Sequence, residues 1–438
     1  MRFRFIARIG AAVALAVQWC PLAAQQAPPV LTLSEVYRAV DQANPALRAA
    51  SASARAGDTR VPGARRLPDP TVQLQLMNRS LPGFGLSDPL GMTQIQVMQM
   101  LPVAGKLGLA GKAAQARADA GHSATAEVAW EKRSEAAMAF FEVHRLDETL
   151  AVSRETLRLL QDLERAVTQM YAVGDARQTD VLRAQLESSK MLAEIEEMSG
   201  MRSGVAERLN TVLARPTGTP VGATVLPILP DTLPPLDSLL ARALLTRGML
   251  RAGQSNLLAA TESEQLAARE IWPDLQVGVS YGQRPMTGGG TDRMVSLMLG
   301  ASVPIWAGSR QRQMRNEAAD MRQMAEADLE AMRLDTRGRI AGLLASLDRT
   351  RRLRQLYANS ILPQARATER SARSAYQSGT VDFMTLLDAL MAVNGYREKL
   401  HQLDAETGVA LAELEMLLGS PVIPGNPAVD HVDGGTTR

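Results

Sequence analysis

The sequence predicts a mainly α-helical chain with a small β part, in which one helix-strand-strand-helix-helix unit occurs twice. Two turns of the form Tyr-x-x-Gly, beginning at Tyr171 and Tyr376, lie about 205 residues apart. Aromatic residues make up only 4% of the chain, whereas Ala, Leu, Met, Glu, Gln and Arg are plentiful, as in long helices that pack along narrow seams. Apolar residues also recur in steps of three and four over long stretches, which indicates coiled-coil packing.

Residues 1–24 have the composition of a signal peptide. Three arginines precede a short apolar stretch, and small residues at 22–24 offer a cleavage site. We therefore expect export and a mature chain that starts near Gln25. Cleavage just before Cys20, followed by lipidation, is a second possibility that the bulky Trp19 fits poorly. The apolar stretch is too short to span a bilayer.

The first repeat covers residues 31–215. One helix is expected over residues 31–64, where an apolar stripe follows the possible caps Thr32 and Ser34. Two strands follow near residues 72–76 and 94–98, because apolar residues there alternate with glutamine.

The rest of the first repeat is predicted to be a helical hairpin. No proline occurs from residue 103 to residue 215, and two heptad seams run along this stretch. Gly174 lies between the seams, so we expect the chain to fold back there into an antiparallel pair of helices.

The second repeat covers residues 236–420, after a linker at residues 216–235 that holds six prolines. It is expected to contain a helix over residues 236–271, two alternating strands, and a second long hairpin that turns at Gly379. Residues 421–438 are rich in Pro and Gly and are expected to be disordered.

The four strands carry one apolar face and one polar or small face. Four strands cannot close a barrel, and an open sheet with an apolar face would have exposed edges. A small hydrophobic core beneath the strands is one solution. The other is self-assembly into a membrane barrel, with apolar side chains toward lipid and Gln, Ser and Gly toward the lumen. Three chains of four strands would give twelve strands, which is within the usual range for such barrels.

No motif predicts an enzyme, a cofactor or a metal site. Gly105-Lys106 and Gly111-Lys112 have the wrong spacing for a phosphate loop, and Ala113 stands where such a loop needs Ser or Thr. The 48 basic and 46 acidic residues are interspersed, so no attraction to nucleic acid is implied. The histidines have no metal-ligand spacing. They are His122, His144, His401 and His431.

The 21 methionines raise the possibility of soft-metal handling. Most of them lie at seam positions, such as Met191 and Met198, where filling of gaps between helices is the better explanation.

The chain resembles the TolC-like outer-membrane efflux proteins over about residues 31–419. The resemblance rests on both Tyr-x-x-Gly turns, on the run Leu386-Leu387-Asp388-Ala389 and on an N-terminal motif. That motif is Leu31-Thr32-Leu33-x-Glu35, followed by Asn44-Pro45-x-Leu47. The resemblance implies a homotrimer in which a twelve-stranded outer-membrane β-barrel tops a long α-helical barrel in the periplasm. Such channels dock on periplasmic adaptor proteins and inner-membrane pumps.

The stretch from Gln99 to Lys106, QMLPVAGK, resembles the strand exit of the heavy-metal-efflux (CzcC-like) branch of this family. It implies kinship with metal-efflux channels. Lys106 itself is expected to have a structural role, near the membrane boundary where a strand becomes a helix.

The resemblance also assigns roles to residues at the helical turns, which in that family lie at the periplasmic end. The residues that match adaptor-contacting turns are Tyr171, Gly174 and Gly379. The residues that match the gate are Asp180, Tyr376 and Asp388. Three copies of each aspartate around one axis would attract cations and repel one another, which favours opening. The alternative is that the two aspartates merely cap or solvate the helices that follow the turns.

These observations predict the exit duct of a tripartite efflux pump, located in the outer membrane with its helical part in the periplasm. Heavy-metal cations are the favoured substrate, and drug efflux or type I secretion are alternatives within the channel class. A soluble periplasmic coiled-coil adaptor is the rival from another class. Adaptors usually have one hairpin and a compact β-rich domain, whereas this chain predicts two hairpins and two strand pairs.

Overall fold

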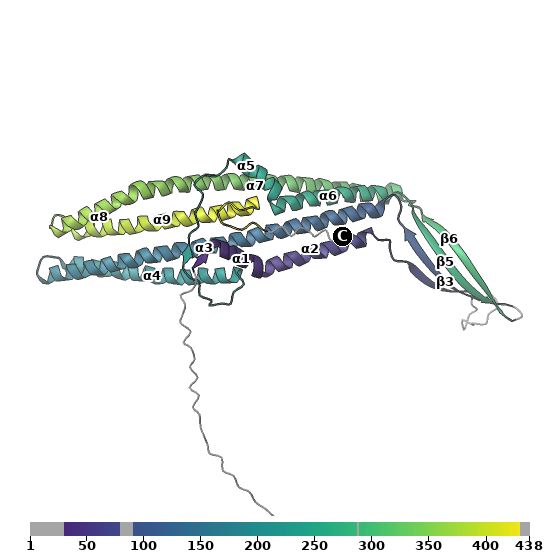
Figure 1. The fold of residues 1–438 in the computed structure, drawn as a ribbon, viewed down its shortest axis with the longest axis horizontal. Helices are drawn as coiled ribbons and strands as arrows, with labels where there is room; N and C mark the ends of the chain where they lie inside the picture. Colours follow the sequence, from purple (N-terminus) through teal and green to yellow (C-terminus); the bar gives the residue numbers. More distant parts are fainter. Residues whose placement is uncertain (1–29, 79–90, 287–288, 430–438) are drawn as a thin grey trace, which may run out of the picture.

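The computed structural model describes residues 30–78, 91–286 and 289–429. The molecule is elongated, with a narrow four-stranded sheet at one end and the turns of two long helical hairpins at the other (Figure 1). The expected signal peptide, Cys20 and His431 lie outside the described residues. The mainly α-helical fold with a small β part is confirmed.

The first helical segment is broken into two helices. They are α1 (Leu33–Ala43) and α2 (Pro45–Arg65). The expectation of one helix over residues 31–64 was wrong, because Pro45 disfavours helical backbone at Asn44. The Asn44 side chain then caps α2 by accepting a hydrogen bond from the N–H of Ala46 at 2.8 Å.

The helix expected over residues 236–271 is broken in the same way. Its parts are α5 (Leu236–Thr246) and α6 (Gly248–Arg269). Between them Arg247 has extended backbone, with φ −66° and ψ 121°. Gly248 lies directly against the long helix α3 (Lys106–Ala172), since a Cβ there would be 2.4 Å from the carbonyl oxygen of Ser123. The break lets the buried Arg247 pair with Glu127, at 3.1 Å.

Two long hairpins form the body of the molecule. The first consists of α3 (Lys106–Ala172) and α4 (Gln178–Val212), and the second of α7 (Arg312–Leu356), α8 (Leu362–Gln377) and α9 (Phe383–Leu418). A π-helical turn (Tyr357–Ile361) joins α7 to α8 just before Pro363. A proline ring clashes with the carbonyl four residues earlier, here that of Asn359, and the wider turn relieves this clash.

The sheet has the strand order β2-β3-β5-β6, and all neighbouring strands are antiparallel. Its strands are β2 (Thr71–Met77), β3 (Met92–Leu101), β5 (Asp274–Pro285) and β6 (Thr291–Ser302). The strands form two β-hairpins, β2-β3 and β5-β6, with the same register. The pair Thr71–Met98 of the first β-hairpin corresponds to the pair Gln276–Gly300 of the second. Strands β3 and β5 join the repeats, so β2 and β6 are the free edges.

The apolar face of this sheet is uncovered in the described part of the chain. Its side chains are strongly exposed, for example Val72 at 69%, Leu297 at 71% and Leu299 at 78%. The described residues therefore do not form the small hydrophobic core that was the alternative beneath the strands. Among the described residues, the helices also include none that is long and apolar enough to cross a membrane.

The largest core lies in the middle of the helical body, between α1, α3, α4 and α9. Its large side chains include Tyr37, Trp130, Phe140 and Phe141, all nearly inaccessible. The linker adds a short strand, β4 (Thr224–Val225), that pairs in parallel with β1 (Leu31–Thr32).

The expectation of disorder from residue 421 onward is wrong for residues 421–429, which pack on this core. Ile423 is 1% exposed. The buried carboxylate of Glu415 accepts hydrogen bonds from the N–H groups of Val422 and Ile423, each at 2.8 Å. Arg133 donates to the carbonyl of Pro427 at 2.7 Å. These bonds hold a proline- and glycine-rich segment that composition alone would leave unfolded.

Candidate functional site

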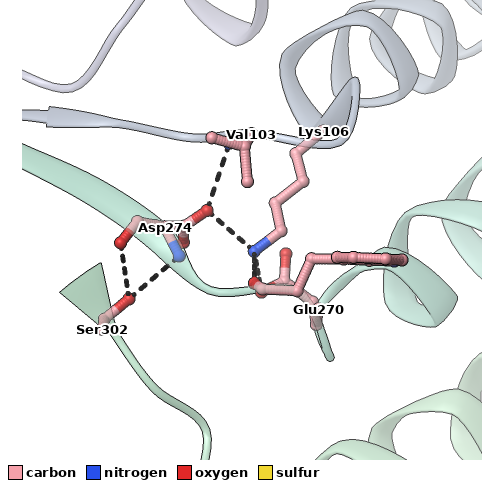
Figure 2. A network of polar contacts seen from close by, with 6 residues as sticks. Val103, Lys106, Glu270, Asp274 and Ser302 are labelled. Atoms are coloured by element: carbon pink, nitrogen blue, oxygen red, sulfur yellow. Dashed lines mark hydrogen bonds and ion pairs between the residues drawn. The ribbon is translucent and has the colours of Figure 1, made fainter.

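One polar network lies where the sheet meets the helices, and Lys106 is at its centre (Figure 2). Strand β3 ends at Leu101, and left-handed backbone at Ala104 and Gly105 (φ 58° and 74°) turns the chain into α3. Glycine adopts this backbone at no steric cost. The turn points Lys106 inward, and the residue is only 5% exposed.

The Lys106 ammonium group is fully used by the second repeat. Its Nζ donates to Oδ1 of Asp274 at 2.9 Å, to the carbonyl of Trp272 at 3.0 Å and to Oε2 of Glu270 at 3.3 Å. The N–H of Asp274 also donates to Oγ of Ser302 at 3.2 Å, which brings β6 into the network. The network therefore ties both repeats together at the rim of the sheet and uses all three N–H donors of the Lys106 ammonium group. These contacts agree with the structural role expected for Lys106.

The two helical turns have the same backbone geometry. The N–H of Gly174 donates to the carbonyl of Tyr171 and that of Asp175 to Met170, at 3.1 and 2.8 Å. The same pair of bonds recurs at the second turn, from Gly379 and Thr380, at 3.0 and 2.9 Å. Both glycines are left-handed, with φ 89° and 71°. This arrangement is the Schellman motif that ends many helices, and it explains why Tyr-x-x-Gly occurs twice.

The predicted adaptor-contacting residues lie at the exposed ends of these turns. Tyr171 is 47% exposed and the neighbouring Val173 is 73% exposed. Gly174 and Gly379 have open space on the side where a Cβ would lie. Both turns lie at the same end of the molecule, opposite the sheet (Figure 1).

The structure brings two of the three predicted gate residues together. Tyr376 of the second hairpin packs edge-on against Phe383, with ring centroids 6.0 Å apart, and its hydroxyl points to Sδ of Met170 at 4.0 Å. Burial, and then the negative charge of Asp180 on the first hairpin, raise the pKa of Tyr376. Asp180 lies in the first turn of α4. The two hairpins therefore meet at their tips within one chain.

Asp388 is not part of this contact. It is exposed on α9, and among the described residues it forms no hydrogen bond or ion pair. It is not a cap either: the N-cap of α9 is Asp382, whose carboxylate accepts from the hydroxyl and the N–H of Thr385 at 2.6 and 3.0 Å. These two bonds lower the pKa of Asp382. Sequence reasoning missed this cap, although an Asp-x-x-Thr pattern directly after the turn was its signal.

The described residues include no group of three or more His, Cys, Asp or Glu side chains that could hold a metal ion. The helical ends thus offer carboxylates and apolar contacts, and the sheet offers a neutral polar surface.

Comparison with known proteins identifies this architecture. The family described as "Outer membrane efflux protein" matches residues 36–215 and 239–420. No curated protein matches the chain in sequence.

Solved membrane proteins have similar folds. The outer-membrane channel OprN is 18% identical, with a TM-score of 0.77 over 88% of this chain and 89% of that chain. CusC is 17% identical, with a TM-score of 0.76 over 88% and 91%. VceC from Vibrio cholerae is 16% identical, with a TM-score of 0.75 over 89% and 96%.

Proposed function

Because the chain belongs to the outer membrane efflux protein family, we propose that three copies of it form the exit duct of a tripartite efflux pump. As a member of this family the protein is located in the outer membrane, with its helical part in the periplasm. The proposal adds the trimeric state, a periplasmic adaptor and an inner-membrane pump as partners, and heavy-metal cations as the substrate.

The observation that carries this proposal is the open sheet with its exposed apolar face. A soluble chain rarely exposes a continuous apolar surface of this kind, which marks an interaction with lipid or protein. Trp272 and Trp306, 54% and 69% exposed, flank the strands at the junction with the helices. Tryptophan is typical of the membrane–water interface, so both support a membrane boundary at this level.

The internal repeat supports closure by identical copies. Within one chain the exit strand of the first repeat pairs with the entry strand of the second, Met98 opposite Gly278. If β6 pairs with β2 of the next copy in the equivalent register, Gly300 lies opposite Gln73. This register also places Leu299 opposite Leu74, so both apolar faces stay on one side of the barrel. Twelve strands would close in this way and leave no free edge.

Cysteine cross-linking tests this arrangement. A Gln73→Cys/Gly300→Cys variant is expected to form covalent trimers on oxidation in the outer membrane, because side chains of directly opposed residues lie close together. Gln73→Cys/Ser296→Cys, shifted by four residues, is the control and is expected to remain uncross-linked. A protein that fractionates as a soluble periplasmic monomer would refute the channel and favour the adaptor alternative.

We also propose that the helical turns dock the adaptor and hold the gate. Tyr171, Gly174 and Gly379 are assigned to docking because they are exposed at the end of the molecule. A shallow groove between α8 and α9, lined by Ser371, Ala375 and other small side chains, lies next to the second turn. It offers a helical partner close approach without steric hindrance.

Asp180, Tyr376 and Asp388 are assigned to the gate. Asp388 supports this role because it is exposed, unpaired among the described residues and not used as a cap. Asp388→Ala is expected to reduce cation selectivity or cation block of the reconstituted channel, since a ring of carboxylates attracts cations. Asp335→Ala, which removes an exposed carboxylate from α7, is the control. Equal conductance and block in both variants and the wild type would remove Asp388 from the gate.

The substrate assignment rests on the QMLPVAGK stretch around Lys106. It is tested by the tolerance of a deletion strain to zinc, cobalt, cadmium and copper salts and to antibiotics. Sensitivity to antibiotics alone would favour drug efflux. If the deletion strain no longer secretes a protein but tolerates metal salts and antibiotics normally, type I secretion would be favoured.

A further inference from the structure

All the methionines of the four strands lie on one face of the sheet, opposite the exposed Leu, Val and Ile. We call this the polar face, because its other side chains are mainly Gln and Ser, such as Gln96, Ser280 and Ser296. The methionines of the polar face are Met77, Met92, Met98, Met100, Met294 and Met298. If they served only as apolar residues, we would expect them among the leucines of the apolar face.

Two of these methionines converge over Gly278. Met98 of β3 and Met298 of β6 both lie opposite Gly278 in the register of the sheet. A Cβ on Gly278 would lie 3.1 Å from Cγ of Met98 and 3.4 Å from Cε of Met298. The missing side chain thus leaves room for two thioethers from different strands to approach each other.

A second group surrounds Gly282, nearer the far end of the sheet. Met294 of β6 lies opposite Gly282 in the register of the sheet. A Cβ on Gly282 would be only 2.4 Å from Cε of Met92. Met92 of β3 and Met294 of β6 therefore lie on either side of a second glycine, on the same face and four residues farther along β5.

The polar face between its two ends carries no charge. At one end Asp274 is paired with Lys106, at 2.9 Å, and at the other Arg284 is paired with Asp292, at 3.1 Å. Hard divalent cations prefer carboxylate and carbonyl oxygens, whereas thioethers select soft ions such as Cu(I). A neutral surface with paired thioethers therefore suits a soft monovalent cation better than zinc or cobalt.

We propose that the polar face binds soft monovalent cations of the class of Cu(I) and Ag(I), through the thioethers around Gly278 and Gly282. The inference rests on the proposed function, since the polar face lines a lumen only in the closed trimer, and it narrows the substrate from heavy-metal cations to soft monovalent ones. Two neutral sites in sequence along the strands of each chain also suit conduction, which needs binding strong enough for entry and weak enough for release.

Silver binding to the purified protein tests the proposal. A variant with all four flanking methionines replaced, M92L/M98L/M294L/M298L, keeps apolar side chains of similar volume but loses the sulfur. The control, M321L/M324L, replaces two methionines of α7 that are 52% and 53% exposed. Every sample is treated with N-ethylmaleimide, so that uncleaved precursor carries no free Cys20 thiol, and Ag(I) binding is measured by calorimetric titration in detergent.

We expect saturable Ag(I) binding by the wild type and the control, and at least a tenfold weaker affinity in the strand variant. No comparable binding of Zn(II) is expected. Equal Ag(I) affinity of the wild type and the strand variant would overturn the inference, and so would Zn(II) binding as tight as that of Ag(I).

The same preparations separate this inference from the proposed function. Trimers that conduct ions normally, without methionine-dependent Ag(I) binding, would overturn the inference alone. A wild type that forms neither trimers nor channels would overturn the proposed function and the inference together, because the polar face would then line no lumen.

Discussion

Replacement of Lys106 tests whether the junction network holds the two repeats together. Lys106→Met keeps most of the side-chain length but leaves the carboxylates of Asp274 and Glu270 without their cation. Removing one partner of a buried ion pair costs about 3–5 kcal/mol. The side chains of Asp274 and Glu270 remain 19% and 35% exposed, so water screens part of this cost. We therefore expect a loss of about 2–3 kcal/mol, or roughly a 30- to 150-fold change in the unfolding equilibrium.

Urea unfolding of the purified protein in detergent measures this loss. The matched control is Lys112→Met, because Lys112 lies in the same helix, is exposed and has no ion-pair partner among the described residues. The double variant Lys106→Met/Asp274→Asn should be more stable than Lys106→Met alone, since it removes the more buried of the two uncompensated carboxylates. A Lys106→Met protein within about 0.5 kcal/mol of the Lys112→Met control would refute the reasoning.

The packed middle of the helical body provides two further tests. Gly408→Ala would place a Cβ 2.3 Å from the buried ring of Phe141, so we expect a loss of about 1–3 kcal/mol in the same urea assay. The control is Gly395→Ala, where the added Cβ meets open space. Equal urea midpoints for the two variants would contradict the expected clash with Phe141. Burial raises the pKa of Glu415. The stabilisation that the Glu415 side chain gives residues 421–429 is therefore complete below the ordinary carboxyl pKa. This stabilisation is lost as the pH rises through the raised pKa. Hydrogen exchange of those residues, corrected for intrinsic rates, should show this loss in the wild type and not in Glu415→Gln. Identical pH profiles of the two proteins would contradict a role of Glu415 in the loss.

The long helices could be predicted from the sequence because heptad seams are local patterns. The interruption at Asn44 also had a local signal, the proline that follows it. The interruption at Arg247 had none, because it depends on the close approach of Gly248 to α3 and on burial of a guanidinium group against Glu127. Local periodicity predicts where a helix can exist, whereas breaks that serve tertiary contacts depend on residues far away in the chain.

The site residues divide in the same way. The Tyr-x-x-Gly turns are local motifs, and their shared backbone geometry follows from the glycine. The partners of Lys106 lie in the other repeat, so no pattern around Lys106 could identify them. The contact between Tyr376 and the first hairpin is equally long-range. Asp382 is the exception, a local cap that the pattern contained and that sequence reasoning overlooked.

The methionines show why a correct general rule can miss a site. Filling of gaps between helices explains Met191, which is 1% exposed in a helical seam. It does not explain Met98 and Met298, whose common partner is Gly278. Their proximity follows from the register that pairs β3 with β5 and β5 with β6, and register between repeats is a tertiary property.

The two repeats use the same turn but place their carboxylates differently. Asp180 follows Gly174 by six residues and Asp388 follows Gly379 by nine, a difference of about 4.5 Å along a helix at ~1.5 Å per residue. In the proposed trimer this gives two rings of three carboxylates at different depths, which repel each other less than one ring of six. A cation would meet negative charge at the periplasmic mouth, whereas the polar face between its two charged ends offers neutral amides, hydroxyls and thioethers. Attraction is thus strongest where the ion enters and weakest where it must be released.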